Sequence, residues 1–164
     1  AYRSMAGPPL IERRIWFDGD AMWIVLDSVR APEIHDLRQT WQFATTGVVL
    51  NGLHARVGGS QSAGVALAVS DAPQQRVFTE KSVISPVYGS QHPAARLIVE
   101  RRAANARSAT VIVAYPPGEN PPAVSVTLSE RRETDQRIVT AVCGSKQTRI
   151  SINGDAWEFL QKGN

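Results

Sequence analysis

The sequence of 164 residues has a single cysteine, no long apolar run and little sign of helical periodicity. Cys143 cannot form an intrachain disulfide, and its apolar surroundings predict a buried structural thiol. No stretch approaches the roughly 18 apolar residues of a membrane span, and AYRSMAGPP at the start lacks the apolar core of a signal peptide. We therefore expect one globular domain, over residues 1–164, with no membrane partner.

Lysine is also scarce, because 15 of the 18 cationic residues are arginine. Arginine pairs bidentately with carboxylate, sulfate or phosphate, so an anionic ligand is one interpretation, and a bias in genomic base composition is another. The net charge is only +3, and the arginine pairs are scattered and interrupted by acidic residues. A nucleic-acid surface usually shows a cationic stripe with aromatic residues between the charges, and that signature is absent. No nucleic-acid partner is predicted.

Motifs for metal binding or catalysis are missing as well. The three histidines, His35, His54 and His92, lie far apart and none has a partner at ligand spacing. Asp18-Gly19-Asp20 begins like a calcium loop, but apolar residues follow at once, so it predicts a turn. No nucleophile elbow and no glycine-rich phosphate loop before a helix is present. The sequence predicts no catalytic residue, no metal and no cofactor.

What the sequence does contain is alternation of apolar and polar residues in about a dozen short runs. Two runs flank Asp18-Gly19-Asp20 and predict a β-hairpin, and residues 96–101 and 108–115 are strong strands. Residues 31–39 better fit a loop, and residues 102–107 read as a polar connection between two strands. Strands at this spacing with Gly, Pro and Asn turns predict an all-β fold, a large antiparallel β-sandwich of two sheets, supersandwich-like.

Two stretches resemble a known family. GPPLIERRIWFDGDAMWIVLDSV, followed by His35 and the strand at residues 40–43, is similar to a segment of heparinase II/III-like polysaccharide lyases. In that segment an "H-R-R-x-V" strand leads to "W-x-V-x-D-x-V". SVISPVYGSQHPAARLIVERRAANARSATVIVAYP resembles the family's "G-W-x-S-x-x-Y-G-x-x-x-P-A" loop and the two strands after it. The order and spacing agree over most of residues 1–128, with Glu12, Gln42 and Ile84 in place of a His, a His and a Trp.

This resemblance implies a role within a larger protein. Family members have an N-terminal α/α toroid followed by a β-sandwich domain, and they cleave acidic polysaccharides by β-elimination. The chain resembles the C-terminal part of that β-domain, which would support the upstream toroid and shape the glycan cleft. The family's catalytic residues lie mostly in the toroid, and no position here matches them, so the chain alone is expected to be inactive. A bacterial origin and a periplasmic or secreted location would follow.

Four residues are the candidates for binding an acidic glycan: Arg13, Arg14, Trp16 and Tyr88. Adjacent residues of a strand point to opposite faces, so only one of the two arginines can enter a cleft. Arg13 shares a face with Ile15 and Phe17. If that face is core, Arg14 and Trp16 share the open face, which favours Arg14 as the glycan contact. The loop that contains Tyr88 fits a turn with a buried hydroxyl equally well.

Two alternatives belong to other functional classes. The chain could be an independent carbohydrate-binding module, in which exposed tryptophans among Trp16, Trp23, Trp41 and Trp157 hold sugar, although Trp23 and Trp41 are most simply core. It could instead be a sandwich for protein–protein contact, which a contiguous apolar face would favour.

Overall fold

The computed structural model describes residues 8–59, 61–131, 136–154 and 156–161. Strands occupy 74% of them with no helix, which confirms the predicted all-β fold, and none of this part could cross a membrane as a helix. The strands are β1 (Leu10–Phe17), β2 (Met22–Phe43), β3 (Val49–Asn51), β4 (His54–Gly59), β5 (Ser62–Val69), β6 (Arg76–Ile84), β7 (His92–Tyr115), β8 (Val124–Arg131), β9 (Gln136–Cys143), β10 (Lys146–Asn153) and β11 (Ala156–Gln161).

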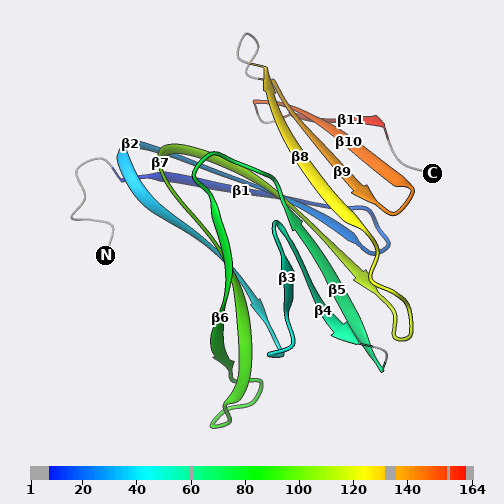
Figure 1. Cartoon of the computed structure of the whole chain (residues 1–164). Coiled ribbons are helices and arrows are strands. Elements are labelled where there is room, and N and C mark those ends of the chain that lie inside the picture. Colours follow the sequence, from blue (N-terminus) through cyan, green and yellow to red (C-terminus); the bar gives the residue numbers. More distant parts are fainter. Residues whose placement is uncertain (1–7, 60, 132–135, 155, 162–164) are drawn as a thin grey trace.

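The strands form two antiparallel sheets (Figure 1). The small sheet has the order β11-β10-β9-β8, and the large one has the order β1-β2-β7-β5-β4-β3, with β6 also paired to β7. On the edge of β7 away from β2, β6 pairs with residues 92–100 and β5 pairs with residues 110–115. Residues 101–108 of β7 therefore pair with no strand but β2 in the described part of the chain, and the large sheet divides there into two arms.

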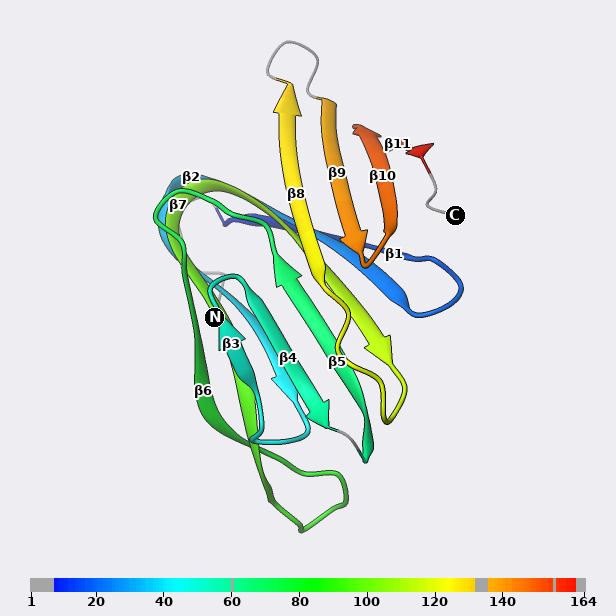
Figure 2. The same ribbon diagram turned by 45° about the vertical axis from the view of Figure 1, so that its right-hand side comes forward.

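Both long strands bend in this stretch, as Figures 1 and 2 show. The β2–β7 ladder is irregular between Arg30 and His35, and Pro32 lies in that gap. Proline has no backbone N–H to donate, so it fits where the ladder is interrupted. We call β6 with the adjoining halves of β2 and β7 the first arm. The second arm contains β1, the other halves of β2 and β7, and β5, β4 and β3.

Two predictions about this region are wrong. Residues 31–39, expected to be a loop, belong to β2, and residues 102–107, expected to be a connection, belong to β7. The two segments pair with each other, as His35 does with Ala103 and Asp36 with Arg102. A ribbon of two strands buries little on either face, so its sequence does not need to alternate between apolar and polar residues. Strand pairing rather than patterning sets the structure here.

The second arm is the middle layer of three, because a core lies on each of its faces. The outer core lies between this arm and the small sheet, and its buried residues include Ile24, Leu26, Val111, Val139, Ile150 and Ile152. The inner core lies inside the bend, between the arms, and contains Phe43, Ala55, Val57, Leu67, Val69, Leu97 and Val99. Alternate residues of one strand serve the two cores, as Val111 and Ile112 of β7 do.

The predicted hairpin between β1 and β2 is confirmed. Oδ1 of Asp18 accepts hydrogen bonds from the backbone N–H groups of Asp20, Ala21 and Met22 at 2.8, 3.0 and 3.0 Å. Gly19 has a φ of 89°, a conformation that glycine adopts without a steric penalty. The Asp-Gly-Asp motif is thus satisfied by turn chemistry.

Cys143 is half-buried against the outer core rather than fully buried, and this burial raises the pKa of its thiol. The raised pKa favours the neutral thiol, which is the less reactive form.

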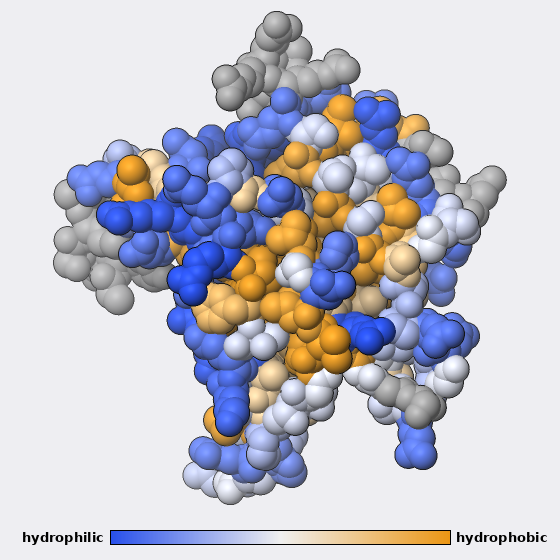
Figure 3. Space-filling model, in the orientation of Figure 1, coloured by the Kyte–Doolittle hydropathy of each residue, from blue (hydrophilic) through white to orange (hydrophobic). Residues whose placement is uncertain are grey.

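Apolar residues gather in the middle of the face shown in Figure 3, around the place where β5 and β8 lie, and hydrophilic residues surround them.

Candidate functional site inside the bend

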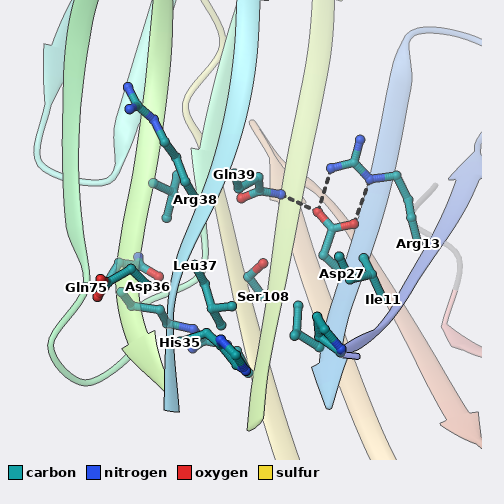
Figure 4. Close-up of a pocket in the computed structure, with 15 residues that line it drawn as sticks. Ile11, Arg13, Asp27, His35, Asp36, Leu37, Arg38, Gln39, Gln75 and Ser108 are labelled. Carbon is teal, nitrogen blue, oxygen red and sulfur yellow. Dashed lines mark hydrogen bonds and ion pairs between the residues drawn. The ribbon is translucent and has the colours of Figure 1, made fainter. Parts of the chain in front are cut away.

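A pocket of about 430 Å³ opens inside the bend of β2 and β7 (Figure 4). Its walls come from β1, from both arms of β2 and β7, and from Gln75, which precedes β6. Ligand pockets commonly measure roughly 300–1,000 Å³. The bend creates this pocket, because it turns the Leu37 end of β2 toward Asp27 of the same strand.

A network of charged and polar groups forms one wall of the pocket. Arg13 donates from its Nε and Nη2 atoms to the carboxylate of Asp27 at 2.6 and 2.8 Å, and Gln39 donates to the same carboxylate. The guanidinium of Arg13 lies 5.2 Å from the ring centre of Trp41, within the range of a cation–π interaction. The hydrogen bond to Asp27 raises the pKa of Arg13, so the charge is fixed at the pocket wall.

Several buried polar atoms in this pocket lack a hydrogen-bond partner. They are Nε2 of His35, Oε1 of Gln39 and Oε1 of Gln75, and Nε1 of the neighbouring Trp41 is a fourth. A buried polar atom without a partner costs about 1–3 kcal/mol. These atoms are the donor and acceptor groups that the region of the pocket offers to a polar molecule.

Arg101 adds an uncompensated charge to the pocket. Its Nη2 donates to the backbone carbonyl of Arg107 at 2.7 Å, and in the described ranges no carboxylate lies close enough to form an ion pair with it. Burial lowers the pKa of Arg101, partly offset by the field of Glu130, which itself pairs with Arg107 at 3.1 Å. The pocket lining therefore includes two arginines that pair with carboxylates, Arg13 and Arg38, and one that does not, Arg101.

The structure separates the two predicted arginines, with Arg13 in the pocket and Arg14 on the opposite face of β1. Arg14 was favoured on the condition that Ile15 and Phe17 face the core, and this condition is not met, since the two residues are 62% and 45% exposed. The small sheet lies on the other side of β1, so the outer core collects Trp16 instead. The premise that favoured Arg14 is therefore reversed, and glycan binding by Arg13, Arg14, Trp16 and Tyr88 stays a prediction.

Arg14 and Trp16 join the two sheets. Nη1 of Arg14 donates to the carbonyl of Gly154, in the turn after β10, at 2.7 Å, and its Nε contacts the Glu12 carboxylate. The ring centre of Trp16 lies 5.1 Å from that of Phe159 on β11. Both side chains thus serve the packing of the small sheet on β1.

The variant Arg14→Ala is expected to lose about 1–3 kcal/mol of its free energy of unfolding, because the Gly154 carbonyl and Glu12 lose a charged donor. Urea unfolding measures this loss. Arg149→Ala is the matched control, since Arg149 is an exposed arginine of the same small sheet and should change stability by less than about 0.5 kcal/mol. Equal stability of the two variants would contradict the joining role of Arg14.

Tyr88 lies apart from the pocket. Its side chain is fully exposed in the loop between β6 and β7, at the far end of the first arm, so the buried-hydroxyl interpretation is wrong (Figure 1). All four tryptophans are half-buried, so no exposed tryptophan platform exists. Trp41 packs against the inner core, as predicted. Trp23 was also predicted to be core, but it stacks on the exposed Phe17 with ring centres 4.7 Å apart and lies in neither core.

Sequence reasoning missed Gln39, Gln75 and Arg101, and treated His35 only as a metal candidate. His54 and His92 are exposed, and the described residues contain no group of three or more metal-binding side chains. His35, Leu37 and Gln39 alternate along β2 and point into the pocket (Figure 4). This alternation is visible in the sequence and could have indicated one pocket-facing side of a strand. It was not used, because residues 31–39 were assigned to a loop.

Comparison with known proteins gives the fold a context. No family model matches the sequence, and no curated protein matches it either. Heparan sulfate lyase HepC from Pedobacter heparinus has a similar structure, with a TM-score of 0.71, 15% identity and coverage of 87% of this chain. The heparinase III–BT4657 gene product has a TM-score of 0.73, 10% identity and coverage of 92%. The chain spans only 23% and 26% of those two proteins, so it shares the fold of one part of each.

Proposed function

We propose that this chain is the C-terminal β-sandwich domain of a heparinase II/III-like polysaccharide lyase. In this proposal an α/α toroid lies upstream, the parent cleaves an acidic polysaccharide by β-elimination, and the domain supports the toroid and shapes the glycan cleft without being catalytic alone. The observation that carries the proposal is the fold shared with heparinases over about nine-tenths of the chain.

The positions of the two family-like stretches support the proposal. The first stretch forms β1 and the start of β2, and the second forms the end of β6, the loop with Tyr88, and β7. β2 and β7 pair along almost their full lengths, so stretches far apart in sequence meet in one ladder. The stretches that resemble the family thus supply β1, β7 and the start of β2, and with them part of the pocket wall.

The inside of the bend is the proposed glycan-facing surface. Arg13 reaches the pocket there, whereas Arg14 is engaged between the sheets. We therefore place the glycan contact at Arg13, with Tyr88 as a separate contact at the far end of the first arm.

Exposed apolar side chains on β1 supply a surface for the toroid. Ile11, Ile15 and Phe17 lie on the same face as Arg13 and are 60%, 62% and 45% exposed. Apolar residues gathered on one surface mark a protein contact. A toroid docked on this row would place the pocket at a domain interface, where ligand sites are common. The same row also favours the alternative, a sandwich used only for protein–protein contact.

The proposal predicts binding of acidic glycan without cleavage. The chain should bind a heparan sulfate oligosaccharide in calorimetry, with an affinity that falls as salt rises, because the contacts are ionic. The absorbance of an unsaturated cleavage product, read at about 235 nm, should not increase. A neutral oligosaccharide of equal length is the control.

Three outcomes would contradict parts of this prediction. Turnover by the chain alone would remove the claim that it is not catalytic. Absence of binding to any acidic oligosaccharide, or equal binding of the neutral one, would remove the glycan-facing role and leave the protein-contact alternative.

A further inference from the structure

We propose that the pocket inside the bend is a subsite for one acidic sugar unit, in which Arg101 binds a carboxylate or sulfate and Gln39 and Gln75 accept hydrogen bonds from hydroxyl groups. This inference rests on the proposed function and deepens it, because it identifies which groups recognise the charge and which recognise the sugar. None of these three residues was a candidate from the sequence.

The anionic group is inferred from Arg101. A half-buried guanidinium has lost part of its hydration, and the neutral Arg107 carbonyl at 2.7 Å replaces it only in part. Glu130 acts on Arg101 through its field but forms no ion pair with it. Burying a charge without an opposite charge is unfavourable. Arg13, in the same pocket, already has Asp27 as its counter-ion. Arg101 is therefore the guanidinium that still lacks an anion.

The hydroxyl groups are inferred from the two glutamines. The amide nitrogen of Gln39 donates to Asp27, and that of Gln75 donates to the Ser70 carbonyl at 3.0 Å. These bonds fix both amides so that their oxygens are the groups left over, and both oxygens are buried without partners. Carbonyl oxygens can only accept, so the missing partners are donors such as hydroxyl groups.

One ligand class satisfies both requirements. Sulfate has no hydroxyl donor at neutral pH, and a neutral sugar leaves Arg101 without an anion. An acidic sugar carries a negative group and several hydroxyls on one ring. The volume of about 430 Å³ admits such a ring, and Val99 and Ala106 in the lining offer apolar contact to its C–H groups.

The test is titration of the protein with four probes, followed by backbone amide signals in NMR. The probes are glucuronate, glucose 6-sulfate, glucose and inorganic sulfate. Either acidic sugar should shift amides of the pocket at concentrations at least about tenfold lower than glucose or sulfate, a difference of about 1.4 kcal/mol. The stronger of the two acidic sugars distinguishes a carboxylate subsite from a sulfate subsite. Equal binding of glucose would overturn the proposal.

Variants locate the binding at Arg101. Arg101→Gln should weaken acidic sugars about tenfold or more and leave glucose unchanged, and Arg101→Lys should restore part of the affinity because it keeps the charge. Arg102→Gln is the matched control: it removes the same charge one residue away, from a side chain that is 74% exposed and lies 3.9 Å from Asp36. Equal affinities of the Arg101→Gln and Arg102→Gln variants would overturn the subsite.

Arg101 also holds the Arg107 carbonyl across the bend, so Arg101→Gln could disturb the fold. Gln75→Glu keeps Arg101 and its bond to the Arg107 carbonyl, and the new carboxylate repels acidic sugars. It loses the amide bond to the Ser70 carbonyl, so urea unfolding of this variant is compared with that of the parent. This variant should weaken glucuronate and glucose 6-sulfate at least severalfold and affect glucose less. If the Arg101 variants bind the heparan sulfate oligosaccharide like the parent, only the subsite fails. If no acidic oligosaccharide binds at all, the proposed function fails as well.

Discussion

The variant Gly64→Ala is expected to lose about 2–4 kcal/mol of its free energy of unfolding. Gly64 on β5 pairs with Tyr115 on β7, and a Cβ atom at position 64 would lie 2.1 Å from Cζ of the tyrosine ring. Tyr115 is buried in the outer core, and its hydroxyl donates to the Val57 carbonyl at 3.0 Å. Alanine would push the ring out of its packing and break that bond, and the expected loss combines overpacking with a lost buried hydrogen bond.

Urea unfolding at constant temperature measures this effect, and two further variants separate its causes. Gly47→Ala is the matched control, because Gly47 has a negative φ and its nearest neighbouring atom is 3.7 Å from the added Cβ. In a Tyr115→Val background the Gly64→Ala change should cost much less, because the obstructing ring is gone. A loss below about 0.5 kcal/mol in the original background would contradict the close approach of Gly64 and Tyr115.

The variant Leu97→Ala is expected to lose about 2–5 kcal/mol, the range for a fully buried leucine. Leu97 has no exposed surface and belongs to the inner core, where β7 of the first arm packs against β4 and β5 of the second. Removing its side chain leaves a cavity between the two arms. Since Val99, two residues further along β7, lines the pocket, this core also fixes the geometry of the pocket.

Val83→Ala is the control for this prediction, because Val83 lies on the same arm but is 58% exposed. It should change the unfolding free energy by less than about 0.5 kcal/mol. If Leu97→Ala were as stable as Val83→Ala, the inside of the bend would be a hollow and not a core. The pocket would then have no rigid wall on the side of the first arm.

Much of the fold follows from local patterns in the sequence. The β1–β2 hairpin was predicted because Asp18 can accept three backbone N–H groups while Gly19 adopts a positive φ, and both requirements are local. The central strands of the second arm, β5 and the end of β7, were predicted because both of their faces pack on a core, which leaves short apolar runs bounded by turn residues. The continuity of β2 and β7 through the bend could not be predicted, because it depends on pairing between residues more than 60 positions apart.

The site was harder to predict than the fold for the same reason. Arg13 was identified from the family resemblance, but the side of β1 that it occupies depends on where the small sheet packs. Arg101, Gln39 and Gln75 come from three different strands or loops and meet only after the large sheet has bent. Their sequence neighbours carry no motif, so nothing local marks them as one site.

The pairing of β2 with β7 also determines the order in which the molecule can assemble. Met22 pairs with Val113 and Phe43 with Ala95, so the ladder joins residues 52 to 91 positions apart. Closing loops of that size costs chain entropy before any contact offsets it, and such topologies fold slowly. The small sheet, in contrast, is built from neighbouring hairpins such as the turn between Cys143 and Lys146. The small sheet can therefore form early, while the bend and its pocket exist only once the most distant parts of the chain have met.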